Sequence, residues 1–136
     1  MDCYRKVLAS KIHRATVTQA DLHYEGSITI PPELLRASGI AEYEAVWVWN
    51  VNQGTRFETY AIAGESGSGN ICVNGAAAHL ASPGDLIIIA CFVSIENDKV
   101  ASHKPKLVFV DPNNKQIMAG VEQEIAGPNK RSWGKP

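Results

Sequence analysis

The sequence predicts a small, mainly β protein, a β-barrel with one or two short helices. The chain has 136 residues, enough for one compact domain, and 45% of them are hydrophobic, enough to build a core. Short segments that alternate apolar and polar residues recur along the chain, separated by turns rich in Gly, Pro, Asn and Ser. Helical signals are confined to two short segments, and no internal repeat is present.

The first third of the chain is predicted to contain two strands and a short helix. Residues 15–18 and 27–30 alternate with the period of a strand. The turn at 24–27 contains Gly26, which is free to adopt a positive φ. Residues 31–39 begin with two prolines and an acid and end with a glycine, which are start and stop signals of a helix.

The rest of the chain is predicted to be mostly strands. Residues 44–51 and 56–62 alternate on either side of a turn, which is the pattern of a β-hairpin. The unbroken apolar run at 86–95 predicts a strand that is buried on both faces. Other elements are expected as strands at 71–74, 106–110 and 116–119 and as one helical turn at 76–80.

Composition and charge narrow the classes of partner. The net charge of −1 gives no reason to expect nucleic acid or an anionic membrane. No apolar run approaches the roughly 20 residues that a membrane-spanning helix needs, and the first residues lack the pattern of a secretory signal. Cys3, Cys72 and Cys91 have no CxxC spacing, so we expect reduced, mostly buried thiols in a cytoplasmic protein.

The usual catalytic signatures are missing from the sequence. There is no GxSxG elbow, HExxH helix or phosphate-binding glycine loop. The four histidines lack the spacing of metal ligands, so no metal site is expected. A dense polar segment remains, and it contains Lys11, His13, Arg14, Tyr24, Gly26 and Ser27. The same Gly-Ser step occurs at 67–68, so by itself it indicates an ordinary turn.

A second polar set lies on the strand predicted at 56–62. Its period of two places Arg56, Glu58 and Tyr60 on one face. An arginine can hold a carboxylate and a tyrosine can donate a proton. The alternative is a cross-strand ion pair beside a half-buried tyrosine. The residues alone therefore predict a small β-barrel with a candidate polar site.

Four ordered blocks of sequence resemble the pyruvoyl-dependent aspartate decarboxylase family. They include the segment that ends in Tyr-Glu-Gly-Ser, the Trp-Asn-Val and Arg-Phe-Glu-Thr-Tyr-Ala-Ile segments, Val-Asn-Gly-Ala-Ala-Ala-His, and Gly-Asp-Leu-Ile-Ile. The blocks lie at 11–27, 49–62, 73–79 and 84–88. The resemblance covers roughly residues 1–121, which we expect to form the barrel domain. Residues 122–136 lie outside it and are expected to form a mobile, basic tail.

The resemblance implies a specific fold, activity and maturation. The fold would be a double-psi β-barrel, assembled as a homotetramer with active sites between neighbouring subunits. The activity would be conversion of L-aspartate to β-alanine and CO2, which feeds pantothenate and coenzyme A synthesis. The proenzyme would cleave itself between Gly26 and Ser27, giving a small β chain (1–26) and a large α chain. Residue 27 would become a covalent pyruvoyl group, without metal or pyridoxal phosphate. Whether an accessory protein drives the cleavage stays open.

The resemblance also implies roles for individual residues. Ser27 would give the pyruvoyl group that forms a Schiff base with substrate, and Tyr60 would donate a proton to the product. Thr59 would stabilise the oxyanion during cleavage, and Arg56 would bind a substrate carboxylate. The remaining residues would line or support the site: Gly75, Ala76 and Ala77 as its wall, Asn74 beside the cleavage loop, Lys11 and His13 at its edge, and Trp49 behind it.

One departure and three alternatives accompany the resemblance. Glu58 shares a face with Arg56, so it could pair with that arginine and weaken substrate binding. The chain could instead be a pyruvoyl decarboxylase of another amino acid, or a barrel module that has lost activity. A hydrolase that uses Ser27 ranks last because no partner of a catalytic triad is recognisable.

Overall fold

The computed structural model describes residues 3–131, which form nine strands, one α-helix and two 3-10 helices. The strands are β1 (Tyr4–Thr16), β2 (Gln19–Asp21), β3 (Ser27–Ile30), β4 (Ala45–Asn50), β5 (Arg56–Ala63), β6 (Cys72–Asn74), β7 (Leu86–Glu96), β8 (Lys106–Val110) and β9 (Gln116–Val121). The helices are α1 (Pro32–Ser38), η1 (Gly75–Leu80) and η2 (Asn97–Lys99). The predicted fold class, a mainly β barrel with short helices, is confirmed.

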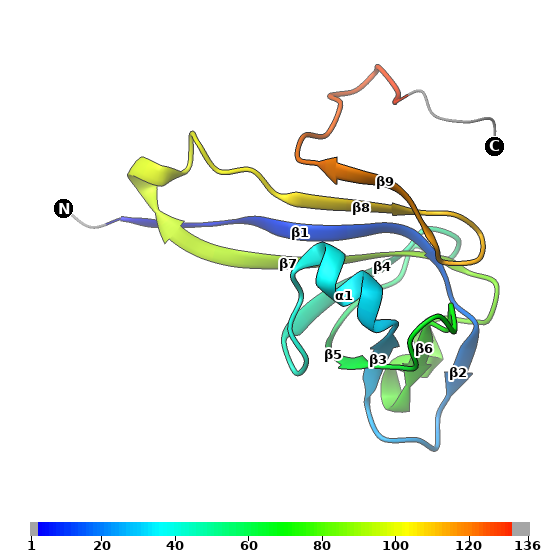
Figure 1. The fold of residues 1–136 in the computed structure, drawn as a ribbon. Coiled ribbons are helices and arrows are strands. Elements are labelled where there is room, and N and C mark those ends of the chain that lie inside the picture. Colours follow the sequence, from blue (N-terminus) through cyan, green and yellow to red (C-terminus); the bar gives the residue numbers. More distant parts are fainter. Residues whose placement is uncertain (1–2, 132–136) are drawn as a thin grey trace.

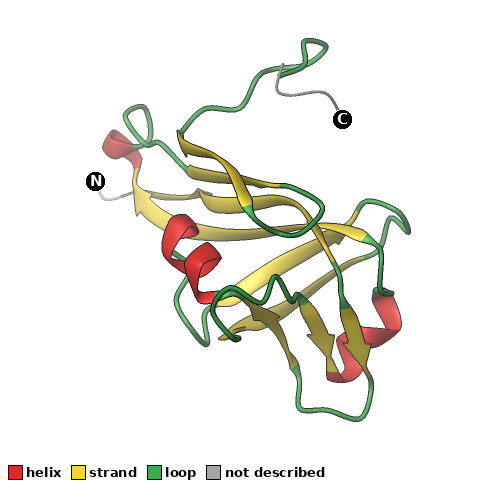
Figure 2. Ribbon diagram, turned by 45° about the vertical axis from the view of Figure 1, so that its right-hand side comes forward, coloured by secondary structure: helices red, strands yellow, loops and turns green. Residues whose placement is uncertain are grey.

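The strands follow one hydrogen-bonded order, β2-β6-β3-β5-β4-β7-β1-β8-β9. The long strands β1 and β7 are antiparallel, and β8 and β9 continue their layer (Figure 1). The short strands β2, β3 and β6 lie at the other end of the order and connect to that layer through β5 and β4. Strands make up most of the framework, and the helices lie at its periphery (Figure 2).

A single apolar cluster fills the barrel. Its fully buried side chains come from most of the strands: Ile12, Ile28, Ile30, Val46, Val48, Val73, Ile87, Ile89 and Val108. Burying one such side chain contributes about 1.5–3 kcal/mol. Because β3, β5 and β6 all anchor side chains in this core, the segments attached to them are held in fixed positions.

Helix α1 forms where the sequence predicted it. Pro32 occupies the first helical position, where a missing N–H costs nothing. Gly39 ends the helix with φ of 76°, and its N–H donates to the carbonyl of Leu35 at 2.8 Å. Leu34 and Leu35 are the buried apolar residues of the helix, and it packs on β8 and β1.

The N-terminal strand is longer than the sequence indicated. The alternation predicted a strand at 15–18, whereas β1 begins at Tyr4 and ends at Thr16. The prediction was wrong for Val17 and Thr18, whose N–H groups donate to the carbonyls of Asp85 and Ile71. The first residues of β1 are exposed and paired only with β7, so they carry no apolar alternation.

The long apolar run forms β7, and even in its first half only one face is fully buried, because Leu86 and Ile88 on the other face are half-buried. Ile87, Ile89 and Cys91 lie in the core, whereas Val93 is 40% exposed. Beyond Cys91, β7 pairs with the start of β1 in an arm that extends from the barrel (Figure 1). The prediction of burial on both faces was therefore wrong.

The predicted hairpin is present. Strands β4 and β5 are antiparallel and pair Trp49 with Arg56 and Ala45 with Tyr60. The inner face carries apolar residues such as Val48, and the outer face carries Arg56, Glu58 and Tyr60, as the period of two predicted.

Two further expectations concern the thiols and the C-terminal segment. The thiol of Cys91 is buried, that of Cys72 is half-buried and that of Cys3 is exposed just before β1.

Strand β9 ends at Val121, and residues 122–131 follow without regular structure. The mobility expected for residues 122–136 stays a prediction, and residues 132–136 lie outside the described part of the chain. Between residues 3 and 131, no helix is long and apolar enough to span a bilayer.

Candidate active site

Strand β3 places Ser27 between two neighbours. β3 is parallel to β5 with Ile28 opposite Ala61, so Ser27 lies at the level of Tyr60. On its other side β3 is antiparallel to β6, and Ser27 is opposite Asn74. Ser27 is only 4% exposed. The structure therefore brings together Ser27, Tyr60 and Asn74, which the sequence analysis selected from three separate segments.

The backbone of Ser27 is strained. Its φ is 123°, a conformation that a residue with a Cβ seldom adopts. Such a residue costs about 1–3 kcal/mol and persists only where its surroundings enforce it. Gly26, which is free to adopt a positive φ, does not adopt one here, and the positive φ lies one residue later, at Ser27. A Cβ built on Gly26 would contact nothing within 4 Å.

The hydroxyl of Tyr60 points at the peptide bond that precedes Ser27. It donates to the carbonyl oxygen of Gly26 at 3.2 Å. Tyr60 also lines an open pocket of about 510 Å³ together with Tyr43, Ala45, Glu58 and Thr59. Thr59 is half-buried in this wall, and its role as an oxyanion donor stays a prediction.

Gly75 supports the loop that carries Gly26. Its φ is 71°, and a Cβ added to it would lie 2.9 Å from the Cα of Gly26. Gly75 is also the first residue of η1, and Ala76 and Ala77 are the next two residues of this helix. The adjacent Asn74 is buried, and its side-chain amide donates to the Thr29 hydroxyl at 3.2 Å. A glycine is therefore required at 75, where the loop that carries Gly26 rests on the backbone.

Arg56 lies at the far end of the outer face from Tyr60. Arg56 and Tyr60 are four positions apart on β5, which places their backbones roughly 13 Å apart along the strand. The guanidinium of Arg56 lies 5.5 Å from the centroid of the Trp49 ring, in a second pocket of about 400 Å³. In the described part of the chain, Arg56 forms no ion pair with Glu58. The pairing that the sequence allowed is therefore absent, and the Arg56 guanidinium lies over the Trp49 ring instead.

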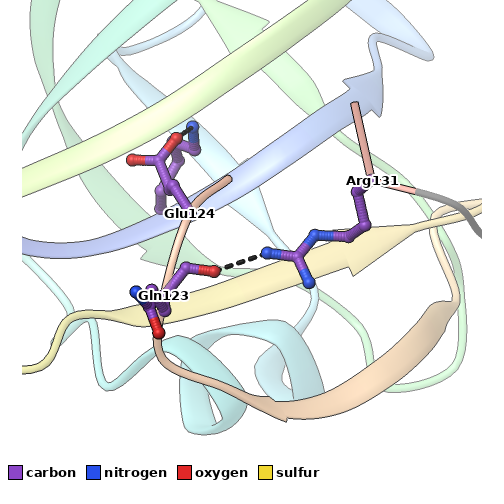
Figure 3. A network of polar contacts seen from close by, with 4 residues as sticks. Gln123, Glu124 and Arg131 are labelled. Carbon is purple, nitrogen blue, oxygen red and sulfur yellow. Dashed lines mark hydrogen bonds and ion pairs between the residues drawn. The ribbon is translucent and has the colours of Figure 1, made fainter. Parts of the chain in front are cut away.

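Lys11 and His13 line a pocket of about 490 Å³ that Ser27 does not line. They lie on β1, and strands β5, β4 and β7 separate β1 from β3 in the sheet order. The ammonium of Lys11 pairs with the carboxylate of Glu124 at 2.7 Å. Glu124 belongs to the C-terminal segment, where the Arg131 guanidinium donates to the carbonyl of Gln123 (Figure 3).

The environment of His13 is unfavourable for its charged form. Burial, followed by the neighbouring charges of Lys11 and Arg14, lowers the pKa of His13 to about 4. Its ring packs edge-on against Phe109, with centroids 5.5 Å apart. The buried Nδ1 of His13 has no hydrogen-bond partner among residues 3–131. His13 is therefore neutral at pH 7 in this arrangement.

The arrangement of Ser27, the Gly26 carbonyl and Tyr60 favours a reaction of the polypeptide chain with itself. A buried serine with a strained backbone follows a carbonyl that accepts a hydrogen bond from a phenol. A hydroxyl nucleophile, an electrophilic carbonyl and an oxyanion donor are the parts that an acyl shift requires. In the described residues, no three His, Cys, Asp or Glu side chains are grouped to hold a metal ion.

Comparison with known proteins gives one consistent result. The family model described as aspartate decarboxylase matches residues 3–117. The chain belongs to the aspartate decarboxylase family. It is 60% identical over 128 residues to aspartate 1-decarboxylase of Myxococcus xanthus, covering 94% of this chain and 98% of the relative. It is 67% identical over 130 residues to that of Legionella pneumophila strain Paris, covering 92% and 98%.

The aspartate decarboxylase match contains the loop that carries Gly26 and every candidate site residue named from the sequence. It ends before Glu124 and Arg131, so the contacts of the C-terminal segment lie outside the matched region. The sequence analysis gave no role to Tyr43, which lines the same pocket as Tyr60. Tyr43 precedes the alternating segment, so the strand pattern carried no signal for it.

Proposed function

We propose that this chain is the proenzyme of a pyruvoyl-dependent decarboxylase that converts L-aspartate to β-alanine and CO2. It is a carboxy-lyase, and its product feeds pantothenate and coenzyme A synthesis. The observation that carries the proposal is the strained, buried Ser27, preceded by a carbonyl that accepts a hydrogen bond from Tyr60. Membership of the aspartate decarboxylase family supports the substrate.

Self-cleavage starts with an acyl shift at Gly26. The Ser27 hydroxyl attacks the Gly26 carbonyl carbon, the peptide C–N bond breaks, and an ester links the two residues. The strained backbone of Ser27 raises the energy of the intact peptide relative to the ester. The Tyr60 hydroxyl stabilises the oxyanion that forms on Gly26, and Thr59 supplies a second donor.

The ester is then lost by elimination. Removal of the α-proton of Ser27 expels Gly26 as a carboxylate and leaves a dehydroalanine. Water replaces its nitrogen, ammonia departs, and a pyruvoyl group remains at residue 27. The two products are residues 1–26 and residues 27–136.

The surroundings of Ser27 fit this group. The pyruvoyl group occupies no more space than the serine it replaces, and Gly75 leaves room for the adjacent loop. When present, it supplies a ketone that takes up the substrate amine and accepts the electrons left as CO2 departs. We therefore expect neither a metal ion nor pyridoxal phosphate in the reaction.

The side chains around residue 27 bind the substrate and return a proton. Arg56 binds a substrate carboxylate with its fork of donors, after turning from Trp49 toward Tyr60. Tyr60 delivers a proton to the substrate carbon that lost CO2. Ala76 and Ala77 form a wall of small residues that lets the substrate approach closely.

We further propose a homotetramer that works in the cytoplasm. Lys11 and His13 are separated from Ser27 in one chain, so they reach a site only from a neighbouring subunit. This arrangement is supported by the open form of the pocket beside Tyr60, which a single chain leaves uncovered. A cytoplasmic location suits the three free thiols, Cys3, Cys72 and Cys91.

The experiment that tests the function uses purified, self-cleaved protein and two amino acids. We expect release of β-alanine and CO2 from L-aspartate, with at most trace product from L-glutamate. The uncleavable Ser27→Ala chain is the control and should release neither. Turnover of L-glutamate in preference to L-aspartate would favour a pyruvoyl decarboxylase of another substrate, and no turnover would favour an inactive barrel module.

A further inference from the structure

We infer that Tyr43 is a positioning residue for Tyr60, holding its ring in the pocket in front of residue 27. The inference rests on the proposed function, which makes Tyr60 the proton donor. Tyr43 acts through Tyr60 and does not touch the reacting atoms. The role would be specific to chains that carry an aromatic residue at this position.

The backbone of Tyr43 is the first observation. Its φ is 69°, in the left-handed region that Gly, Asn and Asp adopt readily and bulky residues seldom adopt. The side chain is 74% exposed, so burial of the ring does not compensate for the strain. Strained residues of this kind gather at functional sites, where the surrounding structure enforces them.

The contacts of Tyr43 are the second observation. Its ring lies 6.2 Å from that of Tyr60, with 23° between the planes, which is an offset stack. The N–H of Tyr43 donates to the carbonyl of Ala61 at 2.7 Å, and the N–H of Ala61 donates to the carbonyl of Glu44 at 3.1 Å. These backbone bonds fix Tyr43 to the residue that follows Tyr60, so its ring limits the rotation of the Tyr60 ring.

Turnover creates the need for this support. In the intact chain, the hydrogen bond to Gly26 helps to hold the Tyr60 hydroxyl. After cleavage, Gly26 becomes a chain end and is no longer covalently tied to residue 27. Within one chain Tyr60 is 38% exposed, so without this bond few contacts of its own chain hold the phenol. Tyr43 belongs to the large chain and remains beside Tyr60 after cleavage, so it keeps the phenol in place for proton delivery.

The kinetic test compares Tyr43→Asn, which suits the left-handed backbone but lacks a ring, with Tyr43→Phe, which keeps the ring. In self-cleaved full-length protein, we expect Tyr43→Asn to lower kcat about three- to tenfold, the range that one aromatic stack supports. KM for L-aspartate should change less than about twofold, and Tyr43→Phe should retain wild-type kcat. Tyr4→Asn removes another exposed tyrosine, at the start of β1, and should change neither constant.

A second readout does not depend on activity. In the uncleavable Ser27→Ala chain, 13C-labelled tyrosine rings give an NMR signal for Tyr60, identified by its loss in Tyr60→Phe. Tyr43→Asn should shift this signal and Tyr43→Phe should shift it far less, because a phenyl ring preserves most of the ring current. Tyr43→Asn should also leave the midpoint of chemical unfolding unchanged or raised, which a purely structural role of the ring would not allow.

The outcomes separate this inference from the proposed function. If Tyr60→Phe is inactive while Tyr43→Asn keeps wild-type kcat and an unshifted Tyr60 signal, Tyr43 does not position Tyr60. A rise in KM alone would make Tyr43 a substrate contact and overturn the positioning role. Full activity of Tyr60→Phe would remove the proton-donor role from the proposed function, and the inference would fall with it.

Discussion

The hydroxyl of Tyr60 lies 3.2 Å from the carbonyl oxygen of Gly26, so the proposed proton donor of the reaction already contacts the peptide bond that must break. One side chain can therefore serve two steps with different demands. In the proposed mechanism, it is one of the donors to an oxyanion during cleavage and the source of a proton during turnover.

The two proposed roles predict that Tyr60→Phe still cleaves itself to completion but decarboxylates poorly. A hydrogen bond to an oxyanion is worth about 1.5–3 kcal/mol, so cleavage should slow by about ten- to a hundredfold but still go to completion, because Thr59 remains as a donor. Decarboxylation should fall by about a hundredfold or more, because a general acid is lost. Denaturing gel electrophoresis follows the first effect and β-alanine release the second. Wild-type turnover by the cleaved variant would remove Tyr60 from the acid role.

The strain at Ser27 predicts a difference between two uncleavable variants. Ser27→Ala keeps a Cβ at φ of 123°, whereas Ser27→Gly relieves the strain. Strain of about 1–3 kcal/mol, less the entropy that glycine loses on folding, leaves Ser27→Gly about 1–2 kcal/mol more stable. Urea unfolding of the two intact chains measures this difference. Equal stabilities would mean that strain does not drive the acyl shift.

Gly75 and Gly54 form a matched pair for testing the support of the cleavage loop. Their φ values are 71° and 74°, so an alanine strains the backbone equally at both. At Gly75 the new Cβ would lie 2.9 Å from the Gly26 Cα, whereas at Gly54 it meets nothing within 4 Å. Gly75→Ala should slow cleavage by about tenfold or more, since a small displacement of reacting groups is costly. Gly54→Ala should cleave at the wild-type rate, and a similar delay in both would assign the effect to the backbone strain.

His13 predicts a loss of stability in mild acid. Its pKa of about 4 in the folded chain lies below the ordinary histidine value of 6.5, so the unfolded chain binds the proton more readily between these values. Stability is therefore complete above pH 6.5 and falls as the pH drops toward 4. Between pH 7 and pH 5 the loss should be about 1 kcal/mol, allowing for solvent screening of the half-buried ring.

Unfolding of the Ser27→Ala chain at the two pH values measures this loss. His13→Gln in the same background should reduce it, whereas the exposed His79→Gln should leave it unchanged. An equal loss in all three chains would show that His13 is not the titrating group.

Short-range sequence patterns correctly predicted the parts of the fold that depend on residues close together in the chain. The glycine stop of α1 and the two faces of the β4–β5 hairpin follow from spacing, and both are present. The start of β1 at Tyr4 was missed because its pairing with β7 involves residues about ninety positions away in sequence. No pattern near Tyr4 reports that partner.

The site was predictable as a set of residues but not as a geometry. Family resemblance selected Ser27 and Tyr60, yet their proximity depends on the register of β3 against β5. The strain at Ser27 depends on two neighbouring strands, so the local sequence, with its flexible Gly26, gave no sign of it. The partner of Lys11, Glu124, lies in a segment that showed no periodicity and was expected to be mobile.

The measurement that tests the central claim most directly is intact mass spectrometry of the purified protein under denaturing conditions. The account predicts two species, one ending at Gly26 and one beginning at residue 27 with the mass of a pyruvoyl group in place of the amino-terminal serine. A single species of full-length mass that persists after prolonged warming would contradict it. Cleavage of the Ser27→Ala chain between residues 26 and 27 would contradict it equally.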